Sequence, residues 1–171
     1  GTSFGGQVAQ VFALRHADVL DRLVLGSTWP LPHPLGALDP EGAARVTALR
    51  QGLPDTAQEL AAHFFPQAFL AAQPQLREVF ARVRPGSERS LRRTQTTTDR
   101  PEGAAADIQA PTLLLAGELD RVVLPELTVQ MAAQLRHAEA RLLPGIGHVA
   151  ALQDPGALAE AIVGFLQRPL P

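Results

Sequence analysis

Two short runs in this chain, residues 23–25 and 112–116, are rich in apolar residues and end at glycine, Gly26 and Gly117. Apolar runs of this length are typical of buried strands in a parallel sheet. Residues 140–143, which read A-R-L-L and end at Pro144, predict a third strand. The sequence between and after them has helical spacing. This alternation predicts an α/β fold with a short parallel sheet flanked by helices.

Three segments beside these runs have apolar residues spaced three and four positions apart, which predicts helices with one buried stripe each. The predicted helices and their stripes are residues 4–16 with Val8, Val11 and Phe12, residues 124–136 with Leu127, Met131 and Leu135, and a helix starting at Asp154-Pro155 with Leu158, Ile162, Phe165 and Leu166. Asp154 is expected to cap its helix, because aspartate before proline is typical of a helix start.

Residues 30–107 have a different pattern. Prolines at 30, 32 and 34 exclude a regular helix or an inner strand there, because proline lacks an N–H donor. Short helices are predicted over residues 41–50, 56–65, 75–84 and 87–98, and the block contains no β-rich run. We therefore expect an all-helical cap inserted between two strands of the sheet.

Composition excludes several classes of protein. The chain has 171 residues, 46% hydrophobic residues and a formal net charge of −2, so nucleic acid and anionic membranes are not expected partners. It has no cysteine, which excludes disulfides and thiolate chemistry. No apolar stretch approaches about 18 residues, so neither a membrane span nor a signal peptide is expected. We expect a soluble, cytoplasmic protein.

Candidate chemistry begins with residues 1–6, which read G-T-S-F-G-G. The pattern G-x-S-x-G is typical of a nucleophile elbow, in which Ser3 would lie on a tight turn between a strand and a helix. Asp120 and His148 each follow an apolar run, and loops after parallel strands gather at the carboxyl edge of the sheet. A histidine held by a carboxylate can take the proton of a serine hydroxyl.

Other residues remain alternatives to this set. Glu118 is the rival acid, and Asp120 itself would also suit a helix cap. Four histidines are interpreted as surface or packing residues: His16, His33, His63 and His137. Three phenylalanines are interpreted as cap core, with a substrate wall as the alternative: Phe64, Phe65 and Phe69. Three arginines are interpreted as a solvated helix face, with a site for a substrate carboxylate as the alternative: Arg89, Arg92 and Arg93. No residue spacing suggests a metal site, and no cofactor is expected.

The chain resembles the C-terminal part of an α/β-hydrolase. Three pieces carry the resemblance: residues 1–6, residues 111–120 and the G-I-G-H of residues 145–148 with its following helix. The resemblance implies a catalytic triad of Ser3, Asp120 and His148, in the chain order that this fold uses. It also implies an oxyanion hole that includes the backbone N–H of Phe4. Trp29 is a candidate for the substrate pocket, and the alternative is a packing role where the cap joins the sheet.

The resemblance further implies a core formed by residues 1–29 and 108–171 and a cap formed by residues 30–107. In the family, the first strands and one oxyanion-hole donor precede the elbow, so we expect the chain to be part of a longer fold. The implied activity is hydrolysis of a small-molecule ester or lactone. The doubled glycine at the elbow is similar to enol-lactonase-like and cofactor-free perhydrolase-like esterases.

Two alternatives to hydrolysis remain. One is acyl transfer or perhydrolysis on the same fold, because the acceptor after acylation depends on the pocket. The other is a catalytically inactive fragment or interaction module. Without preceding strands, the run 23–25 would be an exposed sheet edge, and such edges recruit partners. The partner would be a second copy in a homodimer or a complementing N-terminal segment.

Overall fold

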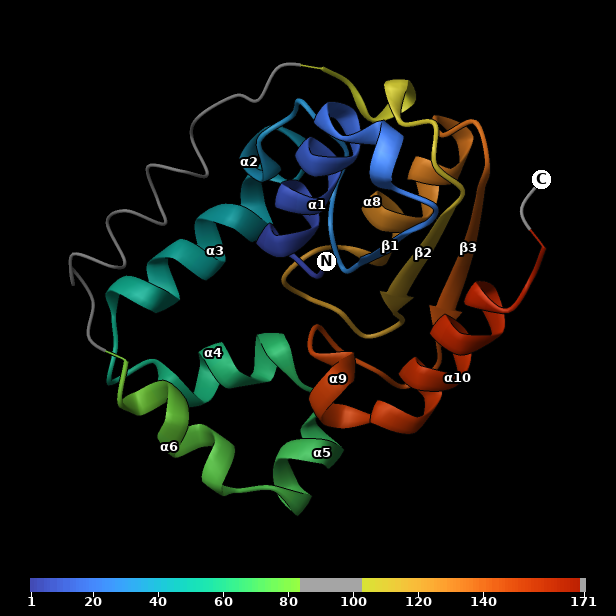
Figure 1. Ribbon diagram of the computed structural model, residues 1–171. Helices are drawn as coiled ribbons and strands as arrows, with labels where there is room; N and C mark the ends of the chain where they lie inside the picture. Colours follow the sequence, from blue (N-terminus) through green and yellow to red (C-terminus); the bar gives the residue numbers. More distant parts are fainter. Residues whose placement is uncertain (84–102, 170–171) are drawn as a thin grey trace.

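A three-stranded parallel sheet forms the centre of the molecule (Figure 1). The computed structural model describes residues 1–83 and 103–169. The strands are β1 (Leu23–Gly26), β2 (Thr112–Gly117) and β3 (Ala138–Leu143), in the order β1-β2-β3. Every residue of β2 is buried, as its unbroken apolar run predicts. The expected α/β class and its parallel sheet are confirmed.

Helices precede, connect and follow the strands. The α-helices are α1 (Phe4–Arg15), α2 (Leu35–Leu38), α3 (Pro40–Gln51), α4 (Ala57–Phe64), α5 (Gln67–Ala72), α6 (Gln75–Ala81), α8 (Pro125–Val129), α9 (Ala150–Gln153) and α10 (Pro155–Leu166). Short 3-10 turns are η1 (Ala17–Val19), η2 (Ala105–Asp107) and η3 (Gln130–Ala133). Between β1 and β2, every regular element in the described residues is a helix, as expected for the inserted segment.

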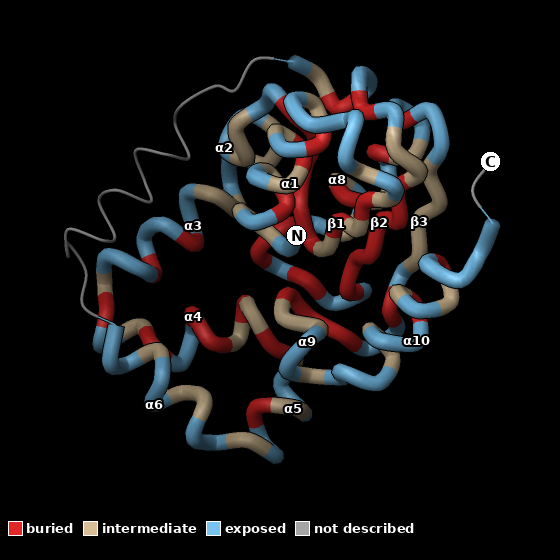
Figure 2. Tube along the Cα trace, viewed as in Figure 1, coloured by how far each residue is buried: buried red, intermediate tan, exposed pale blue. Residues whose placement is uncertain are grey.

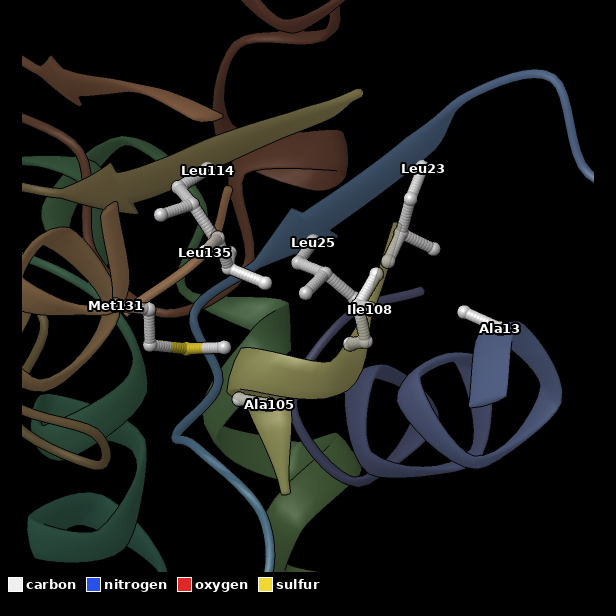
Figure 3. Packing of buried hydrophobic residues seen from close by; sticks show 8 residues of the cluster. All are labelled: Ala13, Leu23, Leu25, Ala105, Ile108, Leu114, Met131 and Leu135. Atoms are coloured by element: carbon white, nitrogen blue, oxygen red, sulfur yellow. The ribbon is translucent and has the colours of Figure 1, made fainter. Parts of the chain in front are cut away.

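The two faces of the sheet are covered by different helices. Figure 3 shows the cluster on one face, in which Leu25 and Leu114 of the strands pack with Ala13 of α1 and Met131 of η3. On the other face, Leu113 and Leu115 of β2 pack against Ala161 and Phe165 of α10. Figure 2 shows this burial concentrated along β2, whereas β3 is mostly of intermediate exposure. The result is three layers, helix, sheet and helix.

Helix α1 forms where expected, but the predicted buried stripe is wrong. Val8 and Phe12 are 55% and 45% exposed. The helix instead buries Gly6, Gln10 and Ala13. The polar Gln10 tolerates burial because its amide is hydrogen-bonded on both sides, donating to the Trp29 carbonyl at 2.9 Å and accepting from Leu31 N–H at 3.2 Å.

The C-terminal helices differ from prediction in two places. The predicted helix over 124–136 is divided into α8 and the 3-10 turn η3, although Met131 and Leu135 are buried as expected. Helix α10 starts as predicted, with the Asp154 carboxylate accepting from Ala157 N–H at 2.9 Å. Leu166 at its end is 46% exposed, so it lies outside the predicted buried stripe.

Helices α3, α4 and α6 correspond to three of the predicted helices of the inserted segment, and the fourth, over 87–98, lies outside the described residues. Helices α2, α5 and α9 are too short for periodicity to predict. The division into a core and a cap at residues 29 and 108 stays a prediction. None of the helices in the described ranges combines the length and apolar character that membrane crossing requires.

The outer side of β1 is hydrogen-bonded to the start of the chain. The Gly26 N–H donates to the Gly1 carbonyl and the Ser3 N–H to the Gly26 carbonyl, both at 2.9 Å. Thr2 thereby forms a parallel bridge with Gly26. Residues 23–25 were predicted to form an exposed edge, but β1 is paired with the start of the chain at its carboxyl end. Association through the rest of that edge stays a prediction.

Candidate active site

Ser3 lies in a turn that holds its backbone in a conformation unusual for a side chain. Its φ is +55° and its ψ is −124°, a region that favours glycine and that non-glycine residues often occupy at functional sites. It is the residue immediately before α1, and its side chain makes no cap hydrogen bond to that helix. The turn thus leaves the half-buried Ser3 hydroxyl available beside the carboxyl end of β1.

The glycines around Ser3 have unequal roles. A Cβ at Gly6 would lie 2.6 Å from the Cβ and Oγ1 of Thr28, and a Cβ at Gly1 would lie 2.7 Å from the Gly5 carbonyl carbon. A Cβ at Gly5 would meet no atom within 4 Å. Close approach therefore requires glycine at positions 1 and 6, whereas the sequence motif suggests positions 1 and 5.

Thr28 and Thr128 join the Ser3 turn to the helix that follows the acid loop. The Thr28 hydroxyl donates to the Ser3 carbonyl at 2.8 Å. The Thr128 hydroxyl accepts from Thr28 N–H at 3.0 Å and donates to the Thr28 carbonyl at 2.6 Å. Both threonines are fully buried, so the two bonds between them are shielded from competing water. The contacts connect α1 to α8 across the end of β1.

Asp120 follows β2 and is almost completely buried, at 3% exposed. Its Oδ1 accepts from the N–H groups of Val122 and Val123, at 2.9 and 3.0 Å. A buried carboxylate requires such partners, because an uncompensated charge in the interior is costly. The two amides fix the carboxylate plane and direct its other oxygen, Oδ2, away from them.

The imidazole of His148 is hydrogen-bonded to Asp120 Oδ2. Its Nδ1 lies 2.8 Å from Asp120 Oδ2, and His148 is 5% exposed. Since Asp120 Oδ1 is already occupied by amides, Nδ1–H of His148 is the natural donor to Oδ2, which leaves Nε2 as the nitrogen that can accept a proton. The rival acid Glu118 is exposed and instead accepts from Gly145 N–H at 2.8 Å.

The loops that carry Asp120 and His148 touch each other through their backbones. A Cβ at Gly117, where β2 ends, would overlap the Gly147 carbonyl and lie 2.6 Å from that of Ile146. Leu119 N–H donates to the same Ile146 carbonyl at 2.8 Å. These contacts hold the two loops side by side, which explains how residues 28 positions apart meet.

Two predicted residues remain, Phe4 and Trp29. Phe4 begins α1, and the N–H of a first helical residue has no acceptor inside its helix. Trp29 is buried against Val122 and Val123, and its indole N–H donates to the His33 carbonyl at 2.9 Å. Between described residues, no hydrogen bond joins the Ser3 hydroxyl to the His148 ring.

Several residues of this site were missed by sequence reasoning. Thr28 and Thr128 have no motif, and only the apolar context of a buried strand end could have pointed to them. Phe64 was assigned to the cap core, and it does pack there, but its ring also lies 5.2 Å from that of His148. Long-range contacts of this kind leave no local signal in the sequence.

Of the other histidines, His63 is buried, and its Nδ1 donates to the Glu59 carbonyl at 3.0 Å. Burial, followed by the positive charges of Arg121 and Arg45, lowers the pKa of His63. His16, His33 and His137 are exposed. Phe65 is buried and Phe69 packs against it, whereas Arg89, Arg92 and Arg93 lie outside the described residues.

Comparison with known proteins identifies the family. The sequence model described as the alpha/beta hydrolase family matches residues 1–161. The parallel sheet, the serine turn and the buried carboxylate–histidine pair agree with this match. The chain belongs to the alpha/beta hydrolase family.

Individual relatives agree with this assignment. The chain is 30% identical to a protein of Pseudomonas savastanoi pv. phaseolicola named "Putative carbamate hydrolase RutD", over 97% of this chain and 66% of that protein. A thermophilic esterase of Thermogutta terrifontis has a TM-score of 0.75 at 24% identity, over 98% of this chain and 63% of that one. The enol-lactonase of Burkholderia xenovorans LB400 has a TM-score of 0.73 at 19% identity, over 98% and 64%.

The two solved structures share the fold, and the chain spans just under two thirds of the length of each of these three relatives.

Proposed function

We propose that this chain carries the catalytic residues of a serine hydrolase that cleaves a carboxylic ester or lactone of a small molecule. The observation that carries the proposal is the buried hydrogen bond of 2.8 Å between His148 Nδ1 and Asp120 Oδ2. It is the arrangement that keeps a histidine in the tautomer needed for a general base. The turn, with φ of +55° at Ser3 and a side chain that makes no cap hydrogen bond, supports Ser3 as the nucleophile.

In the proposed reaction, Ser3 Oγ attacks the substrate carbonyl carbon while His148 Nε2 takes its proton. Asp120 stabilises the imidazolium that forms. The negative charge that develops on the carbonyl oxygen is stabilised by the Phe4 N–H at the start of α1. His148 then gives its proton to the leaving alcohol oxygen, the carbon–oxygen bond breaks, and an acyl-Ser3 intermediate remains. Water, activated by His148, releases the acid.

The substrate class is part of the proposal. Trp29, buried beside the residues that hold Asp120, is the proposed wall of the acyl pocket. Because a relative is named a carbamate hydrolase, a carbamate belongs in the substrate panel beside a p-nitrophenyl ester and a lactone. Acyl transfer and perhydrolysis share the acyl-Ser3 intermediate and differ in its acceptor. Product analysis with water, an alcohol or hydrogen peroxide present separates these outcomes.

The test is hydrolysis of p-nitrophenyl acetate by the unaltered protein and by Ser3→Ala. Ser27→Ala is a matched control, because Ser27 is a second serine with positive φ, at +45°, near the end of β1. We expect Ser3→Ala to reduce the rate to background and Ser27→Ala to retain it. An equal rate for Ser3→Ala and the unaltered protein would exclude Ser3 as the nucleophile.

A further inference from the structure

The loop that carries His148 is attached to the inserted helical segment through its backbone. His148 N–H donates to the Phe64 carbonyl at 2.9 Å. A Cβ at Gly147 would lie 2.5 Å from the same carbonyl oxygen and 3.1 Å from Pro66 Cδ. Only glycine at position 147 permits this approach. The end of α4 therefore fixes the position of the His148 backbone.

The side chain of Phe64 also contacts the His148 ring. The two ring centroids are 5.2 Å apart with an interplanar angle of 85°, the edge-to-face arrangement that aromatic rings favour. The bond from Nδ1 to Asp120 restrains one end of the imidazole, but a single hydrogen bond still allows the ring to tilt about it. Packing against Phe64 limits that tilt.

Phe64 also packs near the residues that hold Asp120. It lies against the cluster of Trp29, Val122 and Val123, and the N–H groups of these two valines donate to Asp120 Oδ1. Phe64 at the same time packs in the core of the inserted segment, beside Leu60 and Phe80. One side chain thus links that helical core to both loops of the carboxylate–histidine pair.

We propose that Phe64 is a positioning residue, which sets the orientation of the His148 imidazole through its carbonyl and its ring. The inference rests on the proposed function, in which His148 is the base. It assigns the end of α4 a part in catalysis that does not involve contact with substrate. Misplacement of a reacting group by about 1 Å can cost about 10²-fold in rate, so modest tilting of the ring is enough to matter.

The test compares Phe64→Leu, Phe64→Ala and Phe64→Tyr with the control Phe80→Leu. The Phe80 ring packs against that of Phe64 in a tilted arrangement, with centroids 5.2 Å apart, in the same helical core. Within the described residues the Phe80 ring makes no ring contact with His148. Its substitution therefore tests the effect of loosening the segment alone. Phe64→Tyr keeps the ring and is the conservative rescue.

Two measurements are made on each variant. NMR of protein labelled with ¹⁵N-histidine follows the imidazole N–H of the His148–Asp120 hydrogen bond, and ester hydrolysis gives kcat and KM. We expect Phe64→Leu and Phe64→Ala to broaden or lose the N–H resonance and to lower kcat by roughly ten- to 10²-fold at similar KM. Phe64→Tyr and Phe80→Leu should keep both.

An unchanged N–H resonance in Phe64→Leu, or an equal change in Phe80→Leu, would overturn the inference. The NMR readout needs no activity, so it separates this inference from the proposed function. If Ser3→Ala hydrolyses the ester normally, the proposed function fails while the resonance still reports whether Phe64 orients His148. Should Phe64→Ala fail to fold, the leucine and tyrosine variants retain enough bulk to decide the question.

Discussion

Asp120 and His148 share one buried hydrogen bond of 2.8 Å, and Asp120 meets it with the one oxygen that its neighbouring amides leave free. The two amides thus fix the orientation of the carboxylate that His148 contacts. This division of the two oxygens makes the pair sensitive to the chemistry of residue 120 and not only to its shape.

Asp120→Asn should therefore abolish most of the activity while preserving the fold. The asparagine carbonyl would face Val122 and Val123 N–H and its NH₂ would face His148 Nδ1, which forces the proton onto Nε2 and removes the base. The expected loss in kcat for p-nitrophenyl acetate is about 10⁴-fold. Glu118→Gln is the control, since Glu118 is exposed and binds Gly145 N–H. If Glu118→Gln causes the larger loss, Glu118 is the acid.

Gly6→Ala should destabilise the protein, because its methyl group would lie 2.6 Å from Thr28 atoms in a buried contact. Overpacking of this kind costs about 1–3 kcal/mol in the free energy of unfolding, measured by urea denaturation. Gly5→Ala is the matched control one position away, where the methyl group meets open space. It should be neutral or stabilising by up to about 1 kcal/mol. Equal losses would contradict the packing argument.

Thr128→Val should lower the free energy of unfolding by more than a typical surface substitution does. Valine retains the shape but leaves the buried N–H and carbonyl of Thr28 without their partner. An unsatisfied buried group costs about 1–3 kcal/mol, so we expect a loss of about 2–4 kcal/mol in the free energy of unfolding. Thr47→Val serves as the control, because the Thr47 hydroxyl binds Ala43 carbonyl on an exposed face. A loss for Thr128→Val no larger than for Thr47→Val would disprove the prediction.

His63 should make stability depend on pH. Burial, together with Arg121 and Arg45, lowers its pKa in the folded state, so the unfolded chain binds a proton more readily. Stability from this residue is present above the unfolded pKa of about 6.5 and is lost as the pH falls through the folded pKa.

Unfolding midpoints in urea between pH 7.5 and pH 5 measure this effect. His63→Asn keeps a donor for the Glu59 carbonyl and should reduce the acid-induced loss. The same substitution at the exposed His137 supplies the comparison. Identical pH dependence in His63→Asn and the unaltered protein would show that His63 does not contribute.

Local patterns in the sequence predicted the strands, because a short apolar run such as residues 112–116 is typical of a buried strand. They also predicted that Asp120 and His148 follow neighbouring strands, and the hydrogen bond between them agrees; their catalytic roles stay predictions. The face of α1 was predicted wrongly. Periodicity assigned Val8 and Phe12 to the interior, but Gln10 takes that place through hydrogen bonds to a distant segment.

Contacts such as Thr28 with Thr128 or Phe64 with His148 join positions about 80 to 100 residues apart. Each residue alone has an ordinary role in a strand end or a helix. Only the folded chain brings their side chains together, so no spacing rule could have selected them.

The meeting of Gly117 with the carbonyls of Ile146 and Gly147 has a practical meaning for redesign. At this contact there is no room for a side chain, so a bulkier residue at position 117 displaces the main chain of the other loop. When these loops are exchanged with those of a homologue, they should be transferred as a pair that includes Gly117 and Gly147.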